Sequence, residues 1–195
     1  MRNLVCGVGV NDSETAITYY DKQGKQTGVC PFYSTWSSML KRCYSVAYQS
    51  SQPTYKGCTV VKEWHTFSMF KGWMESQDWV GKVLDKDLIV EDNKVYSPQT
   101  CCFISPEVNE VFRKYRRTIK TGLPVGVRAS GSRYKTGVQV KSTRLYLGVH
   151  DTIHAADEAV KRAKDDLIKE FALLEEDSRI RSALVNRLHN NAEIA

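Results

Sequence analysis

Residues 126–164 read GVRASGSRYKTGVQVKSTRLYLGVHDTIHAADEAVKRAK, and their pattern predicts how the C-terminal part of the chain folds. Hydrophobic and basic residues alternate over 133–141 and 144–147, which is the two-residue period of strands with one buried face. Thr152 is a typical helix N-cap residue, and an apolar stripe at helical spacing follows it over 153–171. We therefore predict a three-stranded antiparallel sheet packed on one long helix, with the basic side chains on the other face of the sheet. A last helix is predicted over about 179–189.

The same stretch belongs to a segment whose charge is all of one sign. Between Glu110 and Asp151 the chain has ten Lys or Arg residues and no Asp or Glu, whereas the formal net charge of the whole protein is only +6. The rest of the chain is therefore mildly acidic, and the positive charge is local. A confined basic segment of this kind indicates a surface that binds a polyanion, and a solvated basic face without a partner is the alternative.

Upstream of this segment, a chain of 195 residues leaves room for a second small domain. The Gln23-Gly24 pair predicts a hairpin in the first part of the chain, and apolar residues at helical spacing predict helices over 35–47 and 64–73. Residues 84–90 are strand-like, so Asp85 and Asp87 are expected on the same face of that strand.

A helix begins at Ser105-Pro106, with Ser105 as its N-cap, and ends before Gly122 and Pro124. We take that point as a domain boundary. The predicted class is α+β, with domains over 1–34, 35–120 and 121–195.

The C-terminal stretch resembles the Apetala/ethylene-response-factor DNA-binding domain over about 45 residues. The resemblance rests on Gly126-Val127-Arg128, on the aromatic Tyr134, on the strand Arg144-Leu145-Tyr146-Leu147-Gly148 and on the helix that follows Thr152. It implies that the exposed sheet face lies in the major groove of double-stranded DNA, with Arg128, Arg144 and Tyr146 as contact residues. Gly137 and Gln139 depart from the plant members, so their base preference is not transferred.

Charge and alternation add further DNA-contact candidates. Arg133, Lys135 and Lys141 share the basic face of the predicted sheet, and Gln139 lies among them. Arginine can bond guanine through two parallel hydrogen bonds, and lysine anchors phosphates. Just before the sheet, four cations share one face of the helix end by i, i+3, i+4 spacing, and they are Arg113, Arg116, Arg117 and Lys120. They are expected to contact phosphates; cations that favour a helix C-terminus are the alternative.

Residues 36–112 resemble phage-type HNH proteins through WSSMLKRCY, YKGCTVVKEWHTF, LDKDL and NKVYSPQTCCFISPEVN. The resemblance implies a ββα-metal fold, a phage or mobile-element origin and a homing endonuclease that cleaves or nicks duplex DNA with Mg²⁺ or another divalent metal. Aligned on that pattern, Asp85 and Asn109 are the metal ligands and Lys86 replaces the general-base histidine. A lysine is a poor base at neutral pH. His65 and Asp87 are the other catalytic candidates, although each is also typical of a structural or solvated residue.

Hydropathy, the N-terminal residues and the cysteines indicate where the protein is located and whether it binds zinc. No apolar run approaches the roughly 18 residues that a transmembrane helix requires, and Met1–Val10 does not resemble a signal peptide. We therefore expect a cytoplasmic protein without a membrane partner, in the host cytoplasm if it is encoded by a phage. The six cysteines include no C-x-x-C pair; buried free thiols are favoured, and a zinc site from Cys43, Cys58 and Cys101 stays open.

Three hypotheses follow from the sequence. The first is a DNA-binding, metal-dependent HNH-type endonuclease. The second is a catalytically inactive DNA-binding or regulatory protein on a decayed HNH fold. The third is a module that binds an acidic protein, for example a phage inhibitor of a host system.

Overall fold

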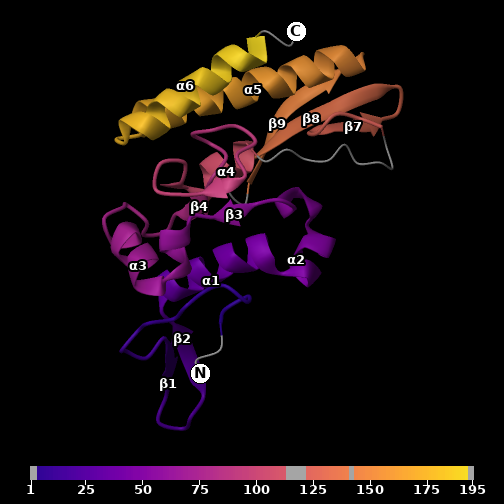
Figure 1. The fold of residues 1–195 in the computed structure, drawn as a ribbon. Helices are drawn as coiled ribbons and strands as arrows, with labels where there is room; N and C mark the ends of the chain where they lie inside the picture. Colours follow the sequence, from indigo (N-terminus) through magenta and orange to yellow (C-terminus); the bar gives the residue numbers. More distant parts are fainter. Residues whose placement is uncertain (1–3, 113–121, 141–142, 193–195) are drawn as a thin grey trace. The chain divides into compact units, whose positions relative to one another are not determined.

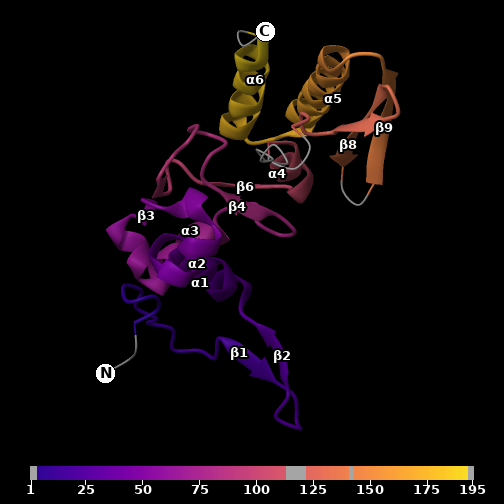
Figure 2. The same cartoon turned by 90° about the vertical axis from the view of Figure 1, so that its right-hand side faces the viewer.

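The computed structural model describes residues 4–112, 122–140 and 143–192, and the chain forms two compact units, Met1–Phe103 and Ile104–Ala195. Both units combine helices with small sheets (Figures 1 and 2). The predicted α+β class is therefore confirmed at this level. Each unit is described separately.

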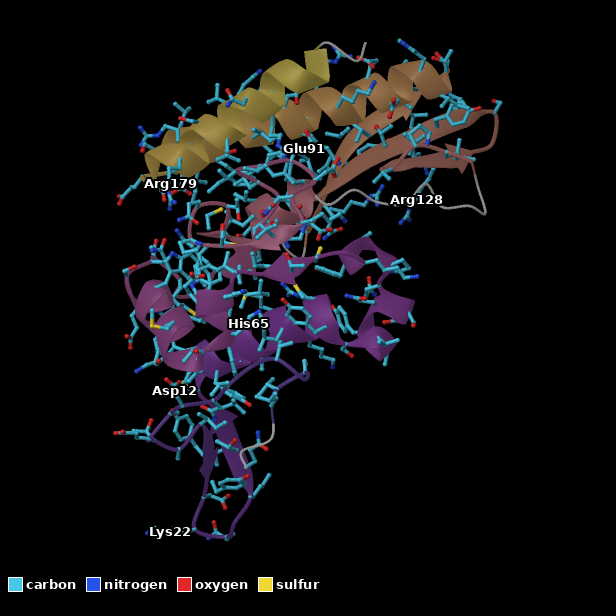
Figure 3. All side chains as sticks on the ribbon, viewed as in Figure 1. Asp12, Lys22, His65, Glu91, Arg128 and Arg179 are labelled. Atoms are coloured by element: carbon cyan, nitrogen blue, oxygen red, sulfur yellow. The ribbon has the colours of Figure 1, made fainter. Side chains whose placement is uncertain are left out.

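The first unit begins with a two-stranded ribbon, β1 (Thr18–Tyr20) and β2 (Gln26–Val29), which pair antiparallel. Asp21 organises the turn, because its Oδ1 accepts hydrogen bonds from the N–H groups of Gln23 at 3.0 Å and Lys25 at 2.9 Å. Gly24 completes the turn with a φ of 78°. The hairpin predicted at this glycine is confirmed; Lys22 beside it is labelled in Figure 3.

Two consecutive helices follow the ribbon, and the first of them contributes to the core. α1 (Pro31–Tyr44) begins with a proline in its first turn and buries an apolar stripe made of Trp36, Met39, Leu40 and Cys43. α2 (Val46–Ser51) follows directly, because the Ser45 hydroxyl accepts the N–H of Tyr48 at 3.3 Å as an N-cap. The single helix predicted over 35–47 is therefore two helices that meet at Ser45.

The predicted helix over 64–73 is also divided. A 3₁₀ turn, η2 (Lys62–His65), precedes α3 (Phe67–Glu75), which packs against α1. The side chain of Trp36 donates from Nε1 to the carbonyl of Trp64 at 2.7 Å and so satisfies a buried polar group. Asp12, labelled in Figure 3, accepts the N–H of Ser68 at 2.9 Å in the first turn of α3.

Short strands complete the unit. After η1 (Pro53–Tyr55), β3 (Thr59–Val60) pairs in parallel with β5 (Val95–Tyr96), and β4 (Val83–Asp85) pairs with β6 (Cys102–Ile104). The strand predicted over 84–90 thus ends at Asp85. The cause is local, since the Asp85 carboxylate binds the N–H groups of Asp87 and Leu88 and turns the chain. The expectation that Asp85 and Asp87 share a strand face is therefore wrong.

The second unit opens with α4 (Pro106–Phe112), which the sequence analysis assigns to the range 35–120. Its predicted cap is confirmed, because the Ser105 hydroxyl accepts the N–H of Val108 at 3.2 Å. A three-stranded antiparallel sheet follows in the order β7 (Val127–Ser130), β8 (Arg133–Val140) and β9 (Thr143–His150).

The sheet packs on α5 (Ile153–Leu174), and α6 (Ser178–Ala192) packs on α5 (Figure 1). Thr152 caps α5 as predicted by accepting the N–H of Ala155 at 3.1 Å. Val127 and Val138 from the sheet meet Ala156 and Val160 from α5 in one buried cluster. The predicted arrangement of three antiparallel strands on one helix is confirmed.

Candidate nucleic-acid interface

The register of the sheet places the six described DNA-contact candidates of β7, β8 and β9 on one face. Residues that pair directly across antiparallel strands share a face, and the pairs are Arg128 with Lys135, Gly137 with Tyr146 and Gln139 with Arg144. The opposite face carries Val127 and Val138, which are buried against α5. We call the exposed side the basic sheet face, and its members are Arg128, Arg133, Lys135, Gln139, Arg144 and Tyr146.

A β-bulge in β9 holds this set together. The register shifts between Thr136 and Gly137, so β9 contains one extra residue at this point. Because strand side chains alternate between faces, a β9 without the extra residue would turn Arg144 and Tyr146 toward the helix. Gly148 lies at the bulge with a φ of 108°, a conformation that other residues adopt only with strain.

Arg128 and Lys135 form a pair of like charges on this face. They lie directly opposite each other on neighbouring strands, and both are exposed. Like charges in this position destabilise a sheet. Neither side chain forms an ion pair with a carboxylate among the described residues. Figure 3 labels Arg128 on β7.

The side chain of Arg144 packs over Gly137 on the neighbouring strand. A Cβ placed on Gly137 would lie 2.8 Å from Nε of Arg144, so the missing side chain leaves the space that the guanidinium group occupies. One end of that group donates from Nη2 to the carbonyl of Gly126 at 3.1 Å. The arginine is therefore oriented before any ligand arrives, and it remains an exposed residue.

Arg133 and Tyr146 occupy the rest of the exposed face. Arg133 pairs with Asp151 at 2.7 Å, although both side chains are more than half exposed and such pairs contribute little. Tyr146 is 62% exposed. This ion pair with Asp151 was not predicted from the sequence, although Asp151 is the first acid after the basic segment.

Five of the predicted DNA-contact residues lie outside the described residues, and they are Arg113, Arg116, Arg117, Lys120 and Lys141.

The catalytic candidates of the first unit form a structural network. The buried Lys86 donates to Oδ1 of Asp87 at 2.6 Å and to the carbonyl of Asn93 at 2.5 Å. The Asn93 side chain donates back to the Lys86 carbonyl at 2.9 Å. Lys86 acts as a donor in both contacts, which is the reverse of the role of a general base. These hydrogen bonds stabilise the loop between β4 and β5.

Asp85 has one carboxylate oxygen fully engaged in the same loop. Its Oδ1 accepts the N–H groups of Asp87 at 2.8 Å and Leu88 at 2.6 Å. Burial raises the pKa of the Asp85 carboxyl, whereas these two hydrogen bonds oppose the rise. Asn109, the other predicted metal ligand, is exposed on α4 in the second unit, so the two ligands come from different units.

His65 has a structural partner. Its Nε2 lies 3.2 Å from the hydroxyl of Tyr44, and the same hydroxyl accepts the N–H of Val60 at 3.0 Å. The His65 carbonyl accepts the N–H of Val10 at 2.8 Å. Figure 3 labels His65 within the helical part of its unit. Its described contacts thus link η2 to α1, β3 and the N-terminal segment.

The cysteines behave as small apolar residues. Cys43, Cys58 and Cys101 are buried free thiols, and burial is the main cause that raises the pKa of Cys43 and of Cys101 to about 12. The prediction of free buried thiols is confirmed for these three. Within residues 4–112, 122–140 and 143–192, no group of three or more His, Cys, Asp or Glu side chains is arranged to hold a metal ion.

Comparisons of the chain with protein-family models, with curated proteins and with solved structures gave no match. None of the helices in the described part of the chain is both long and apolar enough to cross a membrane.

Proposed function

We propose that this protein binds double-stranded DNA through the basic sheet face of its second unit. The observation that carries the proposal is the pair of exposed, directly opposed cations Arg128 and Lys135. Their repulsion is a cost to the free protein, and a polyanion that contacts both would relieve it. A sheet is also an element that the major groove admits.

Each side chain has a distinct task in this proposal. Arg128 and Lys135 contact phosphates and fix the register of the sheet on the duplex. Arg144 packs over Gly137 and is held by the carbonyl of Gly126, and its remaining N–H groups are the donors that we assign to a base edge. Tyr146 contributes an exposed aromatic ring beside it.

The test is a fluorescence-anisotropy titration of the full chain with a labelled duplex at several salt concentrations. The double variant Arg128→Gln/Lys135→Gln should lower the salt slope of log K by about 1.8, since each phosphate contact contributes about 0.9. Lys169→Gln is the matched control, because Lys169 is an exposed lysine on α5. It should leave the slope unchanged. Loss of affinity without a change of slope would contradict the proposed phosphate contacts.

Metal-dependent cleavage remains a separate proposal that rests on the HNH resemblance. One observation favours a role for Asp85 beyond the loop, since its Oδ2 forms no hydrogen bond within the described residues. Supercoiled plasmid incubated with Mg²⁺ and the full chain tests it, with Asp85→Asn and Asn109→Ala as variants. Nicking that both variants abolish would support the cleavage proposal. If the plasmid stays supercoiled with the wild type, the cleavage proposal is refuted and the DNA-binding proposal is unaffected.

A protein partner is the third reading of the basic sheet face. An acidic protein and DNA both complement its charge, so charge alone does not separate them. Failure of the wild type to bind any duplex at low salt would refute the DNA proposal and leave an acidic protein as the partner to seek.

A further inference from the structure

The first unit has an acid-free segment of its own. From Lys22 to Lys62 the chain contains six Lys or Arg residues and no Asp or Glu. Tyrosines are interspersed with these cations. Basic residues interleaved with aromatic ones are typical of nucleic-acid-binding surfaces, provided that the fold brings them together.

The fold brings four of these residues into one row at the end of α1. The ammonium nitrogen of Lys41 lies 5.6 Å from the ring centroid of Tyr48. That ring lies 5.8 Å from the ring of Tyr55, and the guanidinium carbon of Arg42 lies 5.7 Å from the Tyr55 centroid. We call this row the cation–tyrosine ladder. Its residues come from α1, α2 and η1, which are consecutive elements of one unit.

The charge of Arg42 is not balanced within the described residues. It is half-buried, it forms no ion pair with a carboxylate there, and its neighbours are the phenols of Tyr96, Tyr55 and Tyr48. Burial is the largest influence on Tyr96 and Tyr55 and raises the pKa of both, so these phenols are uncharged at neutral pH. Burial lowers the pKa of Arg42, but the neighbouring phenols, with Tyr96 first, outweigh it and raise the pKa, so the guanidinium group stays charged. Its positive charge is left for a bound anion to neutralise.

The surroundings of the ladder add positive rather than negative charge. Lys94 donates from Nζ to the carbonyl of Thr54 at 3.0 Å, which places its ammonium group beside η1. The acid that acts on Tyr55 is Asp87, and Lys86 already pairs with it at 2.6 Å. The negative end of the α1 dipole accounts for a preference for cations at Lys41 and Arg42. The dipole does not account for Tyr48 and Tyr55, which lie between the two cations in the ladder, or for the nearby Lys94.

We propose that the cation–tyrosine ladder is a second binding site, which takes single-stranded nucleic acid. Arg42 and Lys41 bind backbone phosphates, and unpaired bases stack against Tyr48, which is positioned by Tyr55 where that ring packs against the core. Unpaired bases are required because a duplex keeps its aromatic faces inside the stack, whereas tyrosine rings bind exposed base faces. This site is independent of the basic sheet face, which we assign to duplex DNA.

The experiment uses the full chain with Arg128→Gln/Lys135→Gln as background, which removes two of the four described cations of the basic sheet face. A labelled oligothymidine of about 12 nucleotides, within the site sizes known for such surfaces, is titrated by anisotropy. Tyr48→Ala should weaken binding roughly 5- to 100-fold. Lys41→Gln should lower the salt slope of log K by about 0.7, the value for one single-strand phosphate contact. Lys62→Gln is the matched control, because Lys62 is an exposed lysine of the same segment outside the ladder.

Several outcomes would overturn the inference. Lys41 is exposed and its replacement should not unfold the unit, so unchanged binding by both Lys41→Gln and Tyr48→Ala would refute the ladder. Equal losses from Lys41→Gln and Lys62→Gln would show only diffuse attraction. Binding of a labelled free nucleotide, together with no binding of the oligothymidine, would assign the phosphate chemistry to nucleotides and refute the single-strand site. Loss of duplex binding in the sheet variants alone would leave this site standing, so the two proposals fail separately.

Discussion

Replacement of Lys135 by glutamine should change stability and DNA binding in opposite directions. Lys135 faces Arg128 directly across β7 and β8, and directly opposed like charges destabilise a sheet by roughly 0.2–1 kcal/mol. Both residues are exposed, so solvent screening favours the lower part of that range. Removal of one charge should therefore stabilise the second unit by about 0.2–0.5 kcal/mol, which corresponds to a rise in Tm of about 1–4 °C for a unit of this size.

The same change removes one proposed phosphate contact. The salt slope should fall by about 0.9, which at about 0.1 M salt corresponds to a loss of duplex affinity of roughly eightfold. Differential scanning calorimetry measures the stability, and anisotropy titrations measure the binding. Lys169→Gln on α5 serves as the control for both assays. A lower Tm together with unchanged DNA affinity would refute the interpretation that Arg128 and Lys135 repel each other in the free protein and bind phosphates in the complex.

Three further predictions concern stability. Gly137→Ala should destabilise the second unit by about 1–3 kcal/mol in urea unfolding. The new methyl group would lie 2.8 Å from Nε of Arg144 and 2.8 Å from the backbone carbonyl oxygen of Leu145, so both the side chain and the strand must shift. An unchanged midpoint would contradict this packing. Lys86→Met should destabilise the first unit by about 1–3 kcal/mol, because Asp87 and the carbonyl of Asn93 lose the Lys86 donor. An unchanged free energy of unfolding would show that these hydrogen bonds do not stabilise the unit. Burial raises the pKa of Cys43 to about 12 from an ordinary value of 9.0. The contribution of Cys43 to stability is therefore complete below about pH 9 and is lost as the pH rises toward 12. Urea midpoints measured from about pH 8 to 11 should fall, and Cys43→Ala should make that fall smaller.

The C-terminal sheet was predictable because its signals are local. Period-two alternation and the Thr152 cap identify three strands and α5 without knowledge of the rest of the chain. The bulge at Gly148 was not predicted, because one extra residue changes the face of every later side chain but leaves the composition of the strand unaltered. Arg144 and Tyr146 were still assigned to the correct face, because the alternation within residues 144–147 does not depend on the register between β8 and β9.

The first unit was less predictable because side chains there compete with regular structure. The Asp85 carboxylate ends β4 by binding backbone N–H groups, an alternative to the strand that hydrophobicity does not reveal. Ser45 similarly starts a second helix where the pattern favours one. The ion pair of Lys86 with Asp87 depends on a fold that the sequence pattern does not specify.

The salt dependence of duplex binding by the full wild-type chain measures how many DNA phosphates the basic sheet face contacts. Four described cations lie on the basic sheet face, and Arg133 and Arg144 already have protein partners. Between two and four phosphate contacts are therefore expected, and the slope of log K against log salt should lie between about −2 and −4. A slope flatter than about −1, or no binding at about 50 mM salt, would contradict DNA binding by the basic sheet face.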